Sequence, residues 1–142
     1  MTFTPVRVYR VEAGDIPEPR RSDNPLVNLE SPYMFVAAMD VDPAHERLFN
    51  EVYDEEHVPS LLTVSGVRAV TRFRTLPFEL SIGGALKEVP QAAPRYHALY
   101  AIDSPDVLVS PAWSDAVERG RWPLQVRPFT TDRRHMLLER LP

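Results

Sequence analysis

A nearly continuous run of apolar residues from Tyr33 to Met39 sets the first constraint on how this chain folds. The run has the length of one strand, and a strand in the middle of a sheet can cover side chains on both of its faces. Asp42 and Pro43 follow closely, as an N-cap carboxylate and a proline whose fixed φ suits the first turn of a helix. We therefore expect a central core strand that leads directly into a helix.

The predicted helix has one apolar side. Five residues recur there at helical spacing, namely Ala44, Leu48, Val52, Phe49 and Tyr53. This stripe is typical of a helix that lies on a sheet. Because the ring of Pro59 clashes with the preceding turn of a regular helix, we expect a break between residues 55 and 58 and a short second helix through Leu61 and Leu62.

The rest of the chain alternates strand patterns with helix starts. Three segments have the apolar alternation of strands, namely 67–74, 95–102 and 135–141. Ser104-Pro105 and Ser110-Pro111 each combine an N-cap with a proline, and Gly120 is expected to end the second of these helices. The stretch 76–94 contains two adjacent glycines and three prolines, which predict an irregular excursion or a loose hairpin.

The order strand, helix, strand, strand, helix, strand predicts an α+β domain over residues 33–142. It is the split β-α-β arrangement of the ferredoxin-like fold, with an antiparallel sheet. Residues 1–32 are expected to precede it as a strand at Val6–Val11 and a proline-rich arm from Gly14 to Pro32. Helices on one side leave the other face of the sheet uncovered, so we expect a homodimer formed sheet to sheet.

Composition excludes several classes of protein. A length of 142 residues most simply accommodates one domain, and the lack of cysteine excludes disulfides, thiolate metal sites and a cysteine nucleophile. A formal net charge of -4 gives no general attraction to nucleic acid or anionic lipid. No apolar run approaches the roughly 20 residues that cross a bilayer, and the first residues lack a signal-peptide pattern. We expect a cytoplasmic protein with neither a nucleic acid nor a membrane as partner.

The densest cluster of reactive side chains runs from Tyr53 to Pro59. Phe49, Tyr53 and His57 lie four residues apart, so they form one ridge while the helix persists. Histidine is well suited to proton transfer near neutral pH, and a neighbouring carboxylate, Asp54 or Glu56, can orient its ring or raise its pKa. A histidine before a proline is equally typical of a helix end, where the imidazole bonds the last carbonyls. Both interpretations of His57 stay open.

Metal and cofactor motifs are not found. His45 and His57 are twelve residues apart, and the sequence has no His-x-x-x-His pair, so we predict no metal site. It also has no glycine-rich phosphate loop and no Gly-x-Ser-x-Gly elbow, so we predict no cofactor. Any catalysis would therefore depend on side chains and a shaped apolar cavity.

Further candidates for substrate binding are Arg72, Tyr96, Tyr100, Trp113 and Phe49. Arg72 can clamp a carboxylate or an enolate from the middle of a strand. Arg68 and Arg74 share its predicted face, however, and a solvated basic stripe is the simpler explanation. The tyrosines and Trp113 can line a pocket for an aromatic ligand or can belong to the core.

The sequence resembles one known family. The similarity lies in the segments 49–59, 61–67, 72–73, 96–100, 104–108 and 110–113. These resemble the EthD-like branch of the dimeric α+β barrel superfamily, and together they span about Tyr33 to Leu141. The resemblance implies a dimeric α+β barrel and a functional role for Tyr53, Asp54 and His57, with His57 as the proton-transfer group. Relatives often have tryptophan where this chain has Val52, and the arm before Tyr33 lies outside the pattern.

The resemblance leaves the reaction open, because such relatives include lactone isomerases, dehydrochlorinases and cofactor-free monooxygenases. The leading hypothesis is a cofactor-independent isomerase, lyase or cyclase that acts on a small hydrophobic cyclic or aromatic molecule by proton transfer from or to His57. The first alternative is a cofactor-free monooxygenase whose electron-rich substrate reacts directly with oxygen. The second is a non-catalytic protein that binds a small ligand, with His57 as a helix cap.

Overall fold

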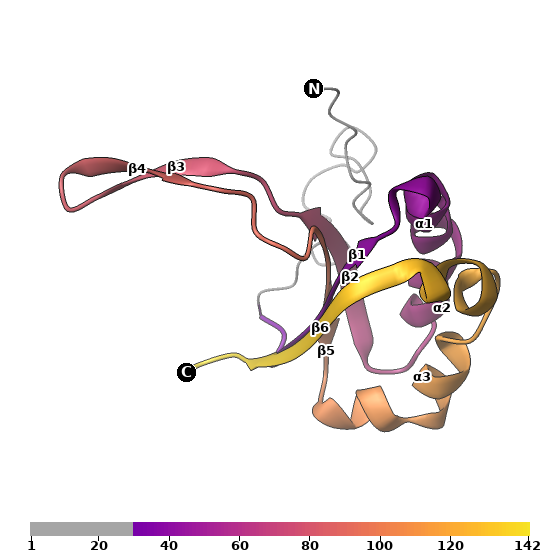
Figure 1. The fold of residues 1–142 in the computed structure, drawn as a ribbon. Coiled ribbons are helices and arrows are strands. Elements are labelled where there is room, and N and C mark those ends of the chain that lie inside the picture. The colour runs from indigo at the N-terminus through magenta and orange to yellow at the C-terminus, as the bar shows by residue number, and fades with distance from the viewer. Residues whose placement is uncertain (1–29) are drawn as a thin grey trace, which may run out of the picture.

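The computed structural model of this protein describes residues 30–142. Its body is a four-stranded antiparallel sheet with helices packed on one face (Figure 1). The strands are β1 (Tyr33–Val41), β2 (Val67–Arg74), β5 (Tyr96–Ile102) and β6 (Thr130–Glu139), in the order β2-β5-β1-β6. This α+β architecture is compatible with the ferredoxin-like fold. The strand expected at Val6–Val11 and nearly all of the arm from Gly14 to Pro32 lie outside the described residues.

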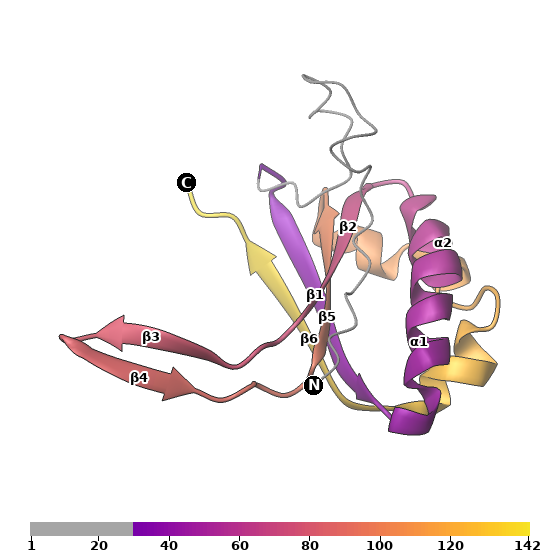
Figure 2. The same cartoon turned by 90° about the horizontal axis from the view of Figure 1, so that it is seen from above.

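Strand β1 occupies the middle of the sheet between β5 and β6, as its apolar run predicts. Phe35, Ala37 and Met39 point to the face that carries the helices, where they pack in the core or line a cavity. No helix of residues 30–142 covers the opposite face (Figure 2). There Met136 and Leu138 of β6 are 50% and 46% exposed.

The first helical segment begins where the sequence predicts. It comprises η2 (Pro43–His45), α1 (Glu46–Val52), the π-helix η3 (Tyr53–His57) and α2 (Val58–Leu62). The Asp42 carboxylate caps it by accepting a hydrogen bond from the Ala44 N–H. The predicted break is wrong, because the chain passes through a π turn in which the Val58 N–H donates to the Tyr53 carbonyl. A π turn is wider than an α turn, and the wider turn accommodates the ring of Pro59 without ending the helix.

The second helical connection is longer and more divided than predicted. It comprises η4 (Pro105–Val109), α3 (Pro111–Ala116), the π-helix η5 (Trp122–Val126) and η6 (Arg127–Phe129). The Ser110 side chain caps α3, as expected, by accepting from the Trp113 N–H. Helix α3 ends at Ala116 rather than at Gly120, and β6 begins at Thr130 rather than at His135. The elements η5 and η6 have no counterpart in the sequence prediction.

A hairpin extends from the body between β2 and β5. It consists of β3 (Phe78–Ile82) and β4 (Ala85–Val89), joined through Gly83 and Gly84, which both have positive φ. This confirms the hairpin interpretation of residues 76–94. The hairpin projects on the side of the sheet opposite to the helices (Figure 2), and its apolar side chains at positions 78, 80, 82 and 86 are exposed.

Candidate active site

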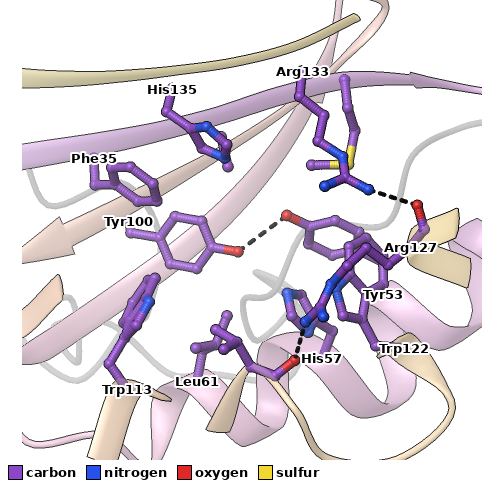
Figure 3. A pocket seen from close by; sticks show the side chains of 13 residues that line it. Phe35, Tyr53, His57, Leu61, Tyr100, Trp113, Trp122, Arg127, Arg133 and His135 are labelled. Atoms are coloured by element: carbon purple, nitrogen blue, oxygen red, sulfur yellow. Dashed lines mark hydrogen bonds between the residues drawn. The ribbon is translucent and has the colours of Figure 1, made fainter. Parts of the chain in front are cut away.

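A cavity of about 180 Å³ lies between the helix face of the sheet and the helices (Figure 3). Strand β1 contributes Phe35, Ala37 and Met39 to its lining. Ala37 is the smallest of the three, and it pairs with His135 on the neighbouring strand β6. Protein interiors are normally as closely packed as organic crystals. The small side chain of Ala37 between two large ones therefore leaves space under the helices.

The His57 imidazole lies inside the π-helix and faces this cavity (Figure 3). The residue is only 6% exposed. Its ring stacks on Trp122 with centroids 4.2 Å apart and meets the Tyr53 ring edge to face at 5.0 Å. Among the described residues, no group hydrogen-bonds the Nδ1 atom. Because the helix continues to Leu62, His57 does not stand at a helix end.

Burial, together with the positive charges of Arg127 and Arg72, lowers the pKa of His57 to about 3. The imidazole is therefore neutral at neutral pH. The expectation that a neighbouring carboxylate raises the pKa of His57 is wrong. The two carboxylates in question are engaged with arginines, since Asp54 accepts from Arg72 at 2.7 Å and Glu56 accepts from the Arg121 N–H at 2.9 Å.

Arg72 is buried, with 2% of its surface exposed, so the predicted solvated basic stripe on β2 is wrong. Its guanidinium donates to the Asp54 carboxylate and, at 2.8 Å, to the Asn50 side-chain oxygen. It also lies over the Tyr53 ring, 4.4 Å from the centroid. Arg68, in contrast, is exposed and pairs with Asp103 at the surface. Arg72 does not line the cavity but supports Tyr53 from behind.

Tyr53 and Tyr100 form a buried pair of phenols beside His57, with their hydroxyl oxygens 3.0 Å apart (Figure 3). Burial raises the pKa of Tyr53, and it raises that of Tyr100 well above the ordinary value. Both hydroxyls therefore keep their protons at neutral pH. One hydroxyl proton forms the hydrogen bond between the two oxygens, and the other hydroxyl can donate a hydrogen bond to an oxygen atom in the cavity.

The eight candidate residues divide between the cavity and the layer behind it. Four of them line the cavity, namely Tyr53, His57, Tyr100 and Trp113. The other four, Asp54, Phe49, Arg72 and Tyr96, do not line it. Of these, Phe49 is fully buried in the core, and the Tyr96 hydroxyl donates to Glu46 at 2.7 Å.

Sequence reasoning missed four polar or aromatic residues of the lining, namely Trp122, Arg127, Arg133 and His135. Arg133 and His135 are two residues apart on β6, so they share a face of the strand. The alternation of side chains along a strand could have revealed that the two share a face. The strand predicted from the sequence begins at residue 135, however, and so does not include Arg133. Trp122 and Arg127 belong to the short helical turns that the sequence pattern does not reveal.

Within residues 30–142, no three His, Cys, Asp or Glu side chains come together in a group that could hold a metal ion. None of the helices in that range has the length and apolar character needed to cross a membrane. The chain matches no protein-family model, and a search of curated proteins finds no match. The similarity to the EthD-like branch consequently stays a prediction from the sequence.

Proposed function

We propose that this protein is a cofactor-independent enzyme that moves a proton on a small cyclic or aromatic molecule, as an isomerase, lyase or cyclase. One observation carries the proposal. The buried, neutral imidazole of His57 lines an aromatic cavity, and no described residue forms a hydrogen bond with its Nδ1 atom. Such a group can accept a proton without first losing one to solvent.

The Tyr53 and Tyr100 pair provides the second part of the chemistry. When His57 takes a proton from a carbon next to a carbonyl, the C–H electron pair forms a C=C bond to the carbonyl carbon. The C=O π pair moves onto the oxygen, where negative charge develops. A phenol proton aimed at that oxygen stabilises the charge. The imidazolium then returns its proton to another carbon or to a leaving group, which restores the neutral base.

We also propose that the protein works as a homodimer in the cytoplasm. The supporting feature is the sheet face that no described helix covers, where Phe73, Met136 and Leu138 are partly exposed. A second copy placed on this face would bury those side chains and form a dimeric α+β barrel. The helix face with its cavity would stay accessible.

Proton transfer can be tested before the natural substrate is identified. Cyclic ketones and unsaturated lactones are incubated with the protein in D2O, and deuterium exchange beside the carbonyl is followed by NMR. His57→Ala should slow the protein-catalysed exchange by about 100- to 10,000-fold, which is the usual contribution of a general base. Glu55→Ala is the matched control, because Glu55 lies on the same π-helix with its side chain exposed.

Three outcomes would overturn the proposal. Exchange that is unchanged in His57→Ala would remove this residue from the chemistry. Compounds that bind without any exchange would identify a binding protein instead. Oxygen consumption with these compounds, in the absence of flavin or metal, would favour the monooxygenase alternative.

A further inference from the structure

The charge of the cavity lining is of one sign. The guanidinium groups of Arg127 and Arg133 contribute positive charge to it, while none of the described residues that line it is acidic. The chain as a whole has a net charge of -4. A lining without carboxylates in an acidic protein favours ligands with negative charge.

The two arginines differ in their partners. Arg127 forms a surface ion pair with Glu118 at 3.0 Å and also donates to the Val117 carbonyl, so its charge is largely compensated. Arg133 donates from Nε to the Thr130 hydroxyl at 2.8 Å and from Nη2 to the Arg127 carbonyl at 2.6 Å. These acceptors are uncharged, and none of the described carboxylates pairs with Arg133.

The bonds of Arg133 fix the direction of its guanidinium. They engage Nε and Nη2, and no described residue accepts a hydrogen bond from Nη1. The side chain reaches over the cavity from β6 (Figure 3). A guanidinium that is held in place but not neutralised is a suitable donor for a carboxylate, because little side-chain entropy is lost when the ligand binds.

Aromatic rings form the walls below this group. His135 stacks parallel to Phe35 with centroids 5.8 Å apart, and Trp113 meets Phe35 edge to face at 5.8 Å. Tyr53, Tyr100 and Trp122 complete the enclosure around His57. Walls of this kind bury a flat ring, and the volume of about 180 Å³ restricts that ring to a small molecule.

We infer that the cavity selects a small ring compound with one carboxylate, which binds Arg133 at the cavity mouth while the ring lies between the aromatic walls. The inference names a substrate class for the proposed enzyme. It rests on the proposed function only for the step in which His57 acts on the ring. Recognition of the carboxylate stands on the geometry of Arg133 and the walls.

A bound carboxylate also supports the chemistry. Burial, with added effects from Arg127 and Arg72, disfavours the protonated form of His57, so the imidazole is a weak base in the empty cavity. A negative charge in the same cavity opposes the effect of the two arginines and so raises the pKa of His57. The substrate would thereby strengthen the base that acts on it.

The chain contains two tryptophans, Trp113 and Trp122, and both line the cavity, so intrinsic fluorescence reports on this site. We would titrate the protein with benzoate and with benzamide, its neutral isostere, and confirm each dissociation constant by calorimetry. Benzoate should bind more tightly than benzamide. Arg133→Gln should raise the dissociation constant for benzoate by about tenfold or more, as expected for a lost charge-assisted hydrogen bond, and should leave that for benzamide unchanged.

Arg134→Gln is the matched control, because Arg134 is the next residue on β6 and points to the opposite face of the sheet. It should leave both constants unchanged. Equal binding of benzoate and benzamide, no benzoate binding at millimolar concentration, or equal losses in the two arginine variants would overturn the inference. An unchanged benzoate constant in Arg133→Gln would do the same.

His57→Ala separates this inference from the proposed function. The variant should bind benzoate and lose deuterium exchange. If benzoate has no advantage over benzamide but exchange depends on His57, the inference fails and the proposed function stands. If benzoate is preferred but His57 does not affect exchange, carboxylate recognition stands and the proposed chemistry fails.

Discussion

At the scale of single residues, the surroundings of His57 determine which proton transfers it can perform. The stacked ring of Trp122 and the edge contact with Tyr53 remove water from the imidazole, and this desolvation is the main reason for its low pKa. An imidazole of this kind is neutral at neutral pH, so it can accept a proton but is not a general acid before it has done so. His57 therefore begins any reaction cycle as the base.

The lowered pKa of His57 has a consequence for stability. In the unfolded chain the group titrates near its ordinary value of 6.5, whereas in the folded protein it titrates at about 3. Between these values the unfolded state binds more protons, so this contribution to stability is present above pH 6.5 and is lost as the pH falls toward 3. The expected slope is at most about 1.4 kcal/mol per pH unit.

Urea unfolding at pH 7 and pH 5 measures this contribution. His57→Gln removes the titrating group, so the free energy of unfolding of the variant should fall less than that of the wild type between these two values. Carboxylates and the other histidines titrate equally in both proteins and cancel in the comparison. Parallel losses in the two proteins would contradict the burial of His57 described above.

His57 and Tyr53 could be selected from the sequence because their spacing survives the change from α- to π-helix. The direction of the pKa shift could not be predicted. It depends on Trp122 and Arg127, which lie far away in the sequence and reach the site only through the fold. Local neighbours such as Asp54 and Glu56 suggested the opposite direction, and both are engaged with arginines.

At the scale of elements, the buried pair of Arg72 and Asp54 joins strand β2 to the π-helix that carries His57. The charge of Arg72 is compensated by this carboxylate and by surrounding aromatic faces. A buried ion pair is not strongly stabilising as a whole, but removal of one partner leaves the other charge uncompensated. The position of the helix on the sheet is therefore sensitive to either residue.

Asp54→Ala should lower the free energy of unfolding by about 3–5 kcal/mol, measured by urea denaturation. The double variant Asp54→Ala with Arg72→Met should cost less than the sum of the two single changes, because it leaves no unpaired charge. Arg68→Met is the control, since it breaks an exposed pair with Asp103 that is worth about 0–1 kcal/mol. Additive costs for Asp54 and Arg72 would show that the two side chains do not depend on each other.

Element types were easier to predict than their interruptions. The apolar run of β1 and the caps at Asp42 and Ser110 have local chemical signals, and each is confirmed. The π-helices η3 and η5 have no such signal, because one additional residue per turn barely alters the spacing of apolar residues. The prolines at 59 and 123 mark both places, but a proline can also end a helix.

At the scale of the whole molecule, the uncovered face of the sheet favours association. Phe73, Met136 and Leu138 lie there, and the hairpin of β3 and β4 projects on the same side (Figure 2). Apolar side chains exposed together on one face are costly in water. The sequence predicted this surface correctly from the helices on one side, whereas the partner itself stays a prediction.

We expect the protein to sediment as a dimer at micromolar concentration. Leu138→Asp should shift it toward monomer, because a carboxylate on the buried face would lose its water without gaining a partner. Leu124→Asp is the control, since Leu124 is 84% exposed on η5, at the helix side of the molecule. A wild-type monomer, or dissociation in both variants, would contradict sheet-to-sheet association.

The groups that the proposed chemistry uses, His57, Tyr53 and Tyr100, come from one polypeptide (Figure 3). In the proposed assembly each copy would therefore carry its own base and its own pair of phenols. A hybrid made of one intact and one His57→Ala polypeptide would keep half the turnover of the parent. Loss of the base in one copy would leave the activity of the other copy unchanged.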